Sequence, residues 1–114
     1  LKQKIDINKF DNLDLKIKPH FIKIDVEGFD FYVLKGLSKT IKKHKPIFLI
    51  EYNKENFTQI DKFLKNYEKY IYDIELDKLI KLKKKYNNKI SRSSETNLLS
   101  NRNIYFLPKW IVNI

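Results

Sequence analysis

Two short apolar runs, separated by a helical stretch, constrain the fold of this chain more than any other feature. Residues 21–26 read Phe-Ile-Lys-Ile-Asp-Val, and residues 46–52 read Pro-Ile-Phe-Leu-Ile-Glu-Tyr. Short runs rich in β-branched and aromatic residues are typical of strands in the interior of a sheet. We therefore predict two strands here, each buried on both faces.

The segments around these runs indicate an alternation of strands and helices. Residues 29–44 and 55–70 carry apolar stripes with helical periodicity. The first stripe consists of Phe29, Val33, Leu37 and Ile41, and Leu34 widens it. Residues 71–76 alternate apolar and acidic side chains, and residues 104–107 form a last apolar run. The order strand, helix, strand, helix, strand, loop, strand predicts an open α/β sheet with parallel strands and flanking helices. The last two strands have no helix between them, so we expect them to pair antiparallel.

Composition narrows the classes of protein to which the chain can belong. Its 114 residues fit one small domain or part of a larger one. There is no cysteine, which excludes disulfides and thiolate metal sites. No apolar run approaches the roughly 20 residues of a membrane-spanning helix. No signal peptide is visible at the start, and we expect a cytoplasmic location.

The net charge of +10 raises the question of a nucleic-acid partner. Lysine supplies nearly all of this charge, and arginine occurs only at Arg92 and Arg102. Arginine is the residue suited to bidentate recognition of bases and phosphates. We therefore interpret the lysine excess as compositional bias, the charged residues 81–85 as a solvated segment, and nucleic acid as a partner that is not expected.

Polar residues that can carry chemistry follow both predicted central strands. Asp25, Glu27 and Gly28 close the first strand, and Glu51 and Asn53 close the second. In an open parallel sheet the ligand site lies beyond the carboxyl ends of the strands, and neighbouring strands are about 4.8 Å apart. We therefore predict that Asp25 and Glu51 face one ligand. Such carboxylates can bind a divalent cation, accept hydrogen bonds from a ligand, or supply a general base, and the residues leave these roles open.

Two neighbouring residues have a structural explanation. Gly28 gives either a tight strand-to-helix turn or room for a ligand to approach the backbone. Asp30 lies in the first turn of the predicted helix, where a carboxylate complements the helix dipole. We assign this structural role to Asp30 and the functional role to Asp25, because a charge that closes a buried strand is costly without a partner.

The sequence around the first strand resembles a known enzyme family. Residues 21–30, FIKIDVEGFD, resemble the IKIDVEG-x-E signature of FkbM-type methyltransferases, with Asp30 where that family commonly has Glu. Residues 33–36, VLKG, resemble the segment that follows the signature. Three further segments resemble parts of the family outside the signature: residues 10–13, 46–51 and 103–108. The resemblance covers nearly the whole chain.

This resemblance implies a partial Rossmann-like class I methyltransferase sheet that uses S-adenosyl-L-methionine to methylate an oxygen of a sugar, glycan or small hydroxylated substrate. It implies that Asp25 and Glu27 are catalytic: Asp25 orients or deprotonates the acceptor hydroxyl, and Glu27 binds substrate or stabilises the turn. Glu51 and Asn53 would complete the substrate side, with a divalent cation as a weaker expectation, and Gly28 would contact the cofactor.

The glycine-rich loop with which such methyltransferases bind their cofactor is missing from the sequence, whose only glycines are Gly28 and Gly36. The chain also begins with Leu and contains no methionine. We therefore interpret residues 1–114 as the C-terminal portion of one methyltransferase domain, whose N-terminal cofactor-binding half lies upstream and without which the fragment is inactive. The alternatives are a noncatalytic remnant and a lysine-rich module that binds nucleic acid or another partner.

Overall fold

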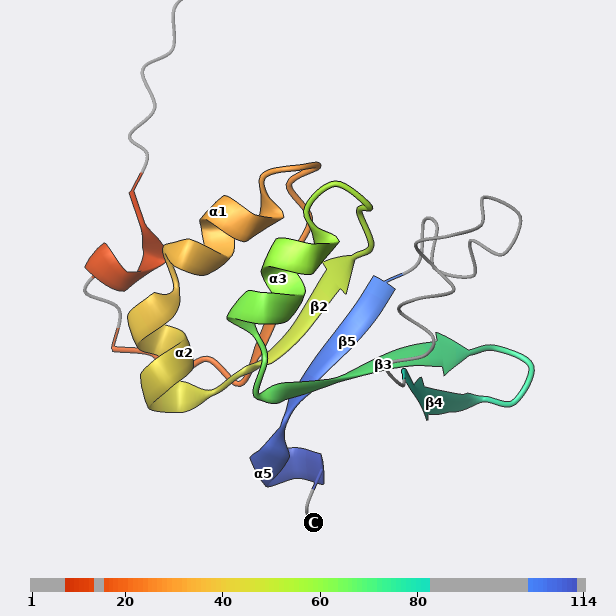
Figure 1. The fold of residues 1–114 in the computed structure, drawn as a ribbon. Helices are drawn as coiled ribbons and strands as arrows, with labels where there is room; N and C mark the ends of the chain where they lie inside the picture. The colour runs from red at the N-terminus through yellow and green to blue at the C-terminus, as the bar shows by residue number, and fades with distance from the viewer. Residues whose placement is uncertain (1–7, 14–15, 83–102, 113–114) are drawn as a thin grey trace, which may run out of the picture.

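The computed structural model describes residues 8–13, 16–82 and 103–112. Within them, a mixed sheet of five strands lies beside short helices (Figure 1). The strands are β1 (Phe21–Ile24), β2 (Ile47–Glu51), β3 (Tyr67–Asp73), β4 (Lys78–Lys81) and β5 (Asn103–Pro108). The helices are η1 (Phe10–Asn12), α1 (Asp30–Lys35), α2 (Ser38–His44), α3 (Phe57–Phe63) and α5 (Lys109–Val112). The polar loop expected over residues 86–103 falls almost entirely outside the described residues.

The strand order in the sheet is β1-β2-β5-β3-β4. β1 and β2 run parallel, with Ile24 opposite Ile50. β5 lies between β2 and β3 and is antiparallel to both, so β3 points in the same direction as β1 and β2. The predicted α/β class and the predicted antiparallel pairing of the closing strand are therefore confirmed.

One face of the sheet carries the hydrophobic core. Phe48 and Ile50 of β2 lie opposite Phe106 and Ile104 of β5, and all four side chains are buried. The helices α1, α2 and α3 lie on this side of the sheet (Figure 1). The helical segments add further buried side chains to the cluster: Leu34, Leu37, Ile60 and Leu64. Burial of each such side chain contributes about 1.5–3 kcal/mol, so this face holds the fold together.

The prediction that both central strands are buried on both faces is wrong. On the face opposite the core, Ile47 and Leu49 are only half-buried, and Phe21 is 51% exposed. β1 is the edge strand of the described sheet, and α1, α2 and α3 cover only the other face. Apolar composition therefore did not reveal that no helix of the described residues covers this side.

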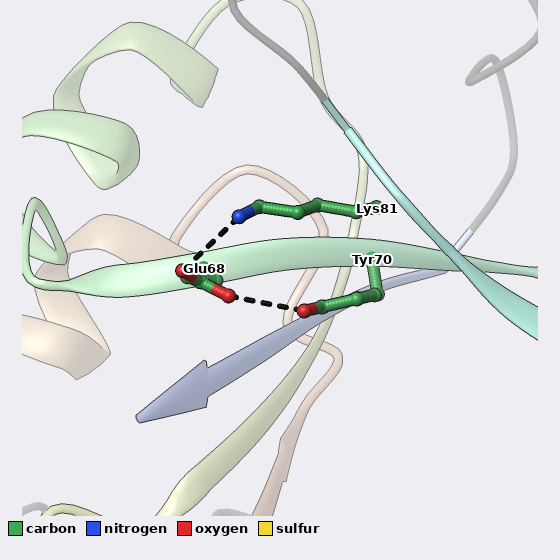
Figure 2. Close-up of polar contacts among 3 residues, drawn as sticks. All are labelled: Glu68, Tyr70 and Lys81. Atoms are coloured by element: carbon green, nitrogen blue, oxygen red, sulfur yellow. Dashed lines mark hydrogen bonds and ion pairs between the residues drawn. The ribbon is translucent and has the colours of Figure 1, made fainter. Parts of the chain in front are cut away.

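A polar cluster lies on this second face, across β3 and β4 (Figure 2). The Lys81 Nζ donates a hydrogen bond to the Glu68 carboxylate at 3.1 Å, and the Tyr70 hydroxyl donates to its other oxygen at 3.0 Å. The bond from Lys81 is the main reason that the pKa of Glu68 lies below its usual value. The cluster links the two strands of the hairpin, although a surface ion pair of this kind is worth only about 0–1 kcal/mol.

The helix predicted over residues 29–44 is two helices, and the break lies at Gly36. The backbone N–H of Asp11 donates to the Gly36 carbonyl at 3.0 Å. The Asp11 carboxylate accepts hydrogen bonds from the backbone N–H groups of Lys39 at 2.7 Å and Thr40 at 3.1 Å. These are orphan donors of the first turn of α2, which the apolar residue at its cap position cannot satisfy. A segment that is distant in sequence therefore caps the first turn of α2.

The break also changes which side chains of this segment reach the core. Of the predicted stripe, Leu34 and Leu37 are buried as expected, whereas Phe29 and Val33 are 65% and 37% exposed. The spacing of four assumed one continuous helix, and a break in the helix rotates its two parts relative to each other.

The second predicted helix, over residues 55–70, is too long. α3 ends at Phe63, and Tyr67 begins strand β3 opposite Pro108. The Tyr67 ring packs against Phe48, with 5.8 Å between ring centroids, so Tyr67 faces the core from a strand. A side chain that points to the core fits the helical and the strand pattern equally well over so few residues.

The sequence analysis assigned no strand to residues 78–81, which form β4. Lys81 is exposed, as expected of the charged residues 81–85, and residues 83–85 lie outside the described ranges. β3 and β4 form a hairpin in which the Leu76 N–H donates to the Asp73 carboxylate at 3.0 Å. Asp77 adopts a left-handed conformation, with φ of 49°, in the same turn. Pairing with β3 makes residues 78–81 a strand.

Replacing Asp11 by Ala should lower the free energy of unfolding by about 1–2 kcal/mol, because α2 loses its cap. Urea unfolding monitored by circular dichroism measures this difference. Asn12→Ala, at an exposed position next to Asp11, is the matched control and should change stability by less than about 0.5 kcal/mol. Equal stability of the Asp11→Ala variant and the wild type would contradict the capping role.

The contribution of Asp11 should depend on pH. Burial raises its pKa, but the hydrogen bonds from Thr40 and Lys39 outweigh burial and hold the pKa below the usual 3.8. Stabilisation by such a group is complete above its unfolded pKa and is lost as the pH falls through its folded pKa. The stability difference between wild type and Asp11→Ala should therefore be constant near neutral pH and shrink below pH 3.8.

Candidate active site

The carboxyl ends of β1 and β2 form one edge of the sheet, and a pocket lies there. Ile24 and Ile50 are paired in the parallel register, so Asp25 and Glu51 are the next residues along two adjacent strands. The pocket has a volume of about 330 Å³. Its lining consists of Asp25, Glu27, Gly28, Asp30, Glu51, Tyr52 and Asn53. The structure thus brings all five residues predicted from the sequence to one pocket.

A tight turn connects β1 to α1 and carries two of these residues. The Phe29 N–H donates to the Val26 carbonyl at 3.2 Å, and Glu27 and Gly28 between them have φ of 30° and 91°. Positive φ at both central positions is the geometry of a type I′ turn. This geometry is strained for Glu27 and natural for Gly28, so the turn holds an acidic side chain in a conformation that glycine would normally occupy.

Gly28 has open space around it. A Cβ atom added at this position would meet no heavy atom within 4 Å. Its backbone conformation, rather than crowding, is therefore the reason for glycine, and the open space leaves the main chain accessible from the pocket. Of the two explanations for Gly28, the turn is observed and the approach of a ligand stays a prediction.

Asp30 has the structural role expected from its place at the start of α1. It is only 3% exposed, and its Oδ1 accepts a hydrogen bond from the Val26 N–H at 3.3 Å. This contact ties the first turn of α1 to the residue that follows Asp25. Asp30 therefore stabilises the strand-to-helix turn from inside, while Asp25 and Glu27 are exposed at the pocket.

Asn53 organises the connection from β2 to α3. Its side-chain Oδ1 accepts a hydrogen bond from the Glu55 N–H at 2.9 Å, and its backbone carbonyl accepts from the Phe57 N–H at 2.9 Å. An amide side chain has one acceptor oxygen and a separate donor nitrogen. The turn uses the oxygen, so the NH₂ group is the part of Asn53 with which a ligand can interact.

Tyr52 lines the pocket but was not among the predicted site residues. Its ring packs against Phe57 with 5.1 Å between centroids, which fixes its orientation. Burial raises the pKa of the Tyr52 hydroxyl, so this group stays protonated at neutral pH and can donate a hydrogen bond. Its position between Glu51 and Asn53 at a strand end was the signal in the sequence.

Asn56, at the start of α3, is a second residue that the sequence did not reveal. It is 6% exposed, and neither its side-chain oxygen nor its nitrogen has a hydrogen-bond partner among the described residues. A buried amide in this state costs about 1–3 kcal/mol unless a further group satisfies it. Its backbone N–H bonds to the carbonyl of Asn53, which places the unsatisfied amide next to the candidate site.

The pocket is acidic although the chain as a whole carries a charge of +10. Its lining includes four carboxylates and no lysine or arginine. Such a lining suits a positively charged group or hydroxyl groups that donate hydrogen bonds. Among the described residues, no three His, Cys, Asp or Glu side chains are arranged to hold a metal ion.

The sulfonium end of S-adenosyl-L-methionine is positively charged, and the acidic lining fits that end of the molecule. The lining residues contain nothing that resembles a site for the adenine ring, since the one aromatic side chain, Tyr52, packs on Phe57. The residues present therefore fit the methyl-donating end of the cofactor and the acceptor, and not the whole cofactor.

Comparison with known proteins identifies the family. The model of the methyltransferase FkbM domain matches residues 3–74, which is more than half of the chain and includes both strand ends of the pocket. No curated protein and no solved structure matches the chain. No helix in the described ranges is both long and apolar enough to cross a membrane. The chain therefore belongs to the FkbM methyltransferase domain family.

Proposed function

We propose that this chain forms the catalytic edge of an S-adenosyl-L-methionine-dependent methyltransferase that methylates a hydroxyl group of a sugar, glycan or other small hydroxylated molecule. Family membership supports methyl transfer in general. The observation that carries the finer proposal is the pocket in which Asp25 and Glu51 lie at adjacent parallel strand ends.

Each pocket residue has a separate role in the proposed methyl transfer. The bound cofactor would supply a methyl group on a positively charged sulfur. Asp25 accepts the proton of the acceptor hydroxyl, which makes the oxygen a better nucleophile. Glu51 lies at the end of the adjacent strand. Its negative charge would stabilise the positively charged sulfur. Tyr52 and the Asn53 NH₂ group donate hydrogen bonds that orient the acceptor.

Glu27 and Gly28 act through the turn that they form. Glu27 is exposed at the pocket and in a strained conformation, and strained residues cluster at functional sites. In this proposal Glu27 contacts the acceptor from the turn. Gly28 lets the cofactor approach the main chain, because no side chain stands between the backbone and the pocket.

A second pocket on the same edge of the sheet supports a hydroxyl-rich acceptor. It has a volume of about 660 Å³, and its lining includes Asp73, Glu75, Tyr72 and Tyr105. Asn103, which also lines it, is paired with Glu51 in the sheet, so the two pockets adjoin. Carboxylates accept hydrogen bonds from hydroxyl groups, and tyrosine rings cover the apolar face of a sugar ring.

The described residues have the exposed surface expected of one part of a larger domain. Beside β1 lies an open cavity of about 770 Å³ with a mainly apolar lining that includes Phe21, Val26 and Val33. Phe21 is 51% and Val26 is 42% exposed. A single exposed edge strand with apolar neighbours favours further pairing. We propose that a preceding cofactor-binding half pairs with β1 and that residues 1–114 form the C-terminal portion of the domain.

Replacing Asp25 by Asn in the full-length protein should lower kcat about 10²–10⁴-fold, because the general base is lost. Transfer of a radiolabelled methyl group from S-adenosyl-L-methionine to a panel of mono- and disaccharides measures this. Glu55→Gln removes a carboxylate that is exposed near the site but does not line the pocket, and it should leave transfer unchanged. Full activity of Asp25→Asn would remove Asp25 from the mechanism.

Replacing Gly28 by Ala should lower the free energy of unfolding by about 1–2 kcal/mol, because Ala is strained at a φ of 91°. Gly36→Ala is the control, since Gly36 has a right-handed φ of −71° and its Cβ would meet Lys9 and the Val33 carbonyl no closer than 3.4 Å. That change should alter stability by less than about 1 kcal/mol. Urea unfolding compares the two variants.

The same pair of variants separates the turn role of Gly28 from cofactor contact. Calorimetric titration of the folded full-length protein with S-adenosyl-L-methionine should show weaker binding for Gly28→Ala than for Gly36→Ala. If both variants bind as the wild type does, Gly28 serves the turn alone.

A further inference from the structure

A separate cavity lies at the opposite edge of the sheet from the candidate active site. Tyr67 is the first residue of β3 and Pro108 the last of β5, and both line it. The cavity has a volume of about 530 Å³, within the range of small-molecule sites. It lies between α2, the end of α3 and α5, which approach one another at this edge (Figure 1).

Aromatic and aliphatic side chains form its walls. Ile41 of α2, Phe63 of α3, Tyr67 of β3 and Trp110 of α5 all line the cavity. Trp110 is 46% exposed, yet its indole N–H donates a hydrogen bond to the Lys45 carbonyl at 2.9 Å. A large ring that is half exposed and held in place offers a flat surface on which a planar ligand can stack with little loss of conformational entropy.

The charges around the cavity all have one sign. Lys42, Lys45 and Lys109 line it, and its lining contains no aspartate or glutamate. The charge of Lys109 helps to lower the pKa of Glu68. Glu68 also accepts hydrogen bonds from Lys81 and Tyr70 (Figure 2). The three lysines therefore place positive charge at the mouth of an apolar space, and Glu68 offsets only part of the charge of Lys109.

Tyr67 also lines the cavity, but its hydroxyl is enclosed by protein atoms. Its hydroxyl is buried and has no hydrogen-bond partner among the described residues. Burial raises the pKa of this hydroxyl, so it carries its proton at neutral pH. The cavity thus combines a fixed aromatic surface with three cations.

We propose that this cavity binds a small planar aromatic anion, whose ring stacks on Trp110 and whose acidic group lies among Lys42, Lys45 and Lys109. This site is distinct from the pocket at Asp25 and Glu51, because it lies beyond the opposite ends of the strands. Its ligand chemistry is also the reverse, since this cavity is cationic and that pocket is acidic.

Naphthalene-1-sulfonate is a suitable probe, because it combines a planar ring with a permanent negative charge. Calorimetric titration of the full-length protein should show binding at least about tenfold tighter than that of methanesulfonate, which lacks the ring, or naphthalene-1-methanol, which lacks the charge. Equal binding of either comparison compound would overturn the proposal.

Substitutions locate the probe. Lys42→Gln combined with Lys109→Gln removes two exposed cations from the cavity and should weaken binding at least about fivefold. Lys18→Gln combined with Lys78→Gln makes the same charge change at exposed positions outside it and should change binding less than about twofold. Equal weakening in both pairs would show nonspecific attraction to a basic protein and refute the site.

Trp110 is the only tryptophan of the 114 residues and reports on the cavity directly. The probe should quench tryptophan fluorescence in the wild type, and Trp110→Phe, which keeps a smaller aromatic ring, should weaken calorimetric binding of the probe. Asp25→Asn should bind the probe normally, so failure of the methyltransferase proposal and failure of this one give different results. Binding without any change at Trp110 would place the probe elsewhere and contradict the proposal.

Discussion

The parallel pairing of β1 with β2 is the constraint on which the candidate site depends. Ile24 lies opposite Ile50 in this register, and both side chains are buried in the core. A shift of one residue would turn each strand's apolar side chains to the wrong face, so core packing holds the register. Because the register is held, Asp25 and Glu51 leave the two strands at the same level. The chemistry of the pocket therefore rests on apolar contacts that lie outside it.

The turn between β1 and α1 positions the residues of the pocket that follow β1. Asp30 is buried and accepts a hydrogen bond from the residue after Asp25, while Gly28 and Glu27 adopt left-handed conformations. The turn presents two carboxylates at one strand end, where their mutual repulsion opposes folding. Helices at the other end of the strands create a cavity of opposite character, with lysines around an aromatic wall. A basic chain thus places an acidic pocket and a lysine-lined cavity at the two ends of one sheet.

Much of this arrangement was accessible from the sequence, because it depends on local features. The two apolar runs that end in charged residues predicted β1, β2 and the pocket. The helical spacing of apolar residues after each run predicted a helix after each strand. Errors arose where a distant segment decides the local structure. Asp11 divides the first predicted helix by bonding to Gly36 and capping α2. Pairing with β5 extends β3 back to Tyr67, and pairing with β3 makes a strand of the charged residues that form β4. The buried amide of Asn56 has no signature in composition or spacing.

The sequence by itself determined the α/β class, the two central strands and the residue types at their ends, because strand propensity and polar termination are encoded within a few neighbouring residues. Only the tertiary structure decided where helices break, which face of the sheet the described helices cover and which side chains share a pocket. Those outcomes depend on hydrogen bonds and packing between segments that are far apart in the chain. The contact between Trp110 and Lys45 joins residues 65 positions apart, and no local pattern could have revealed it.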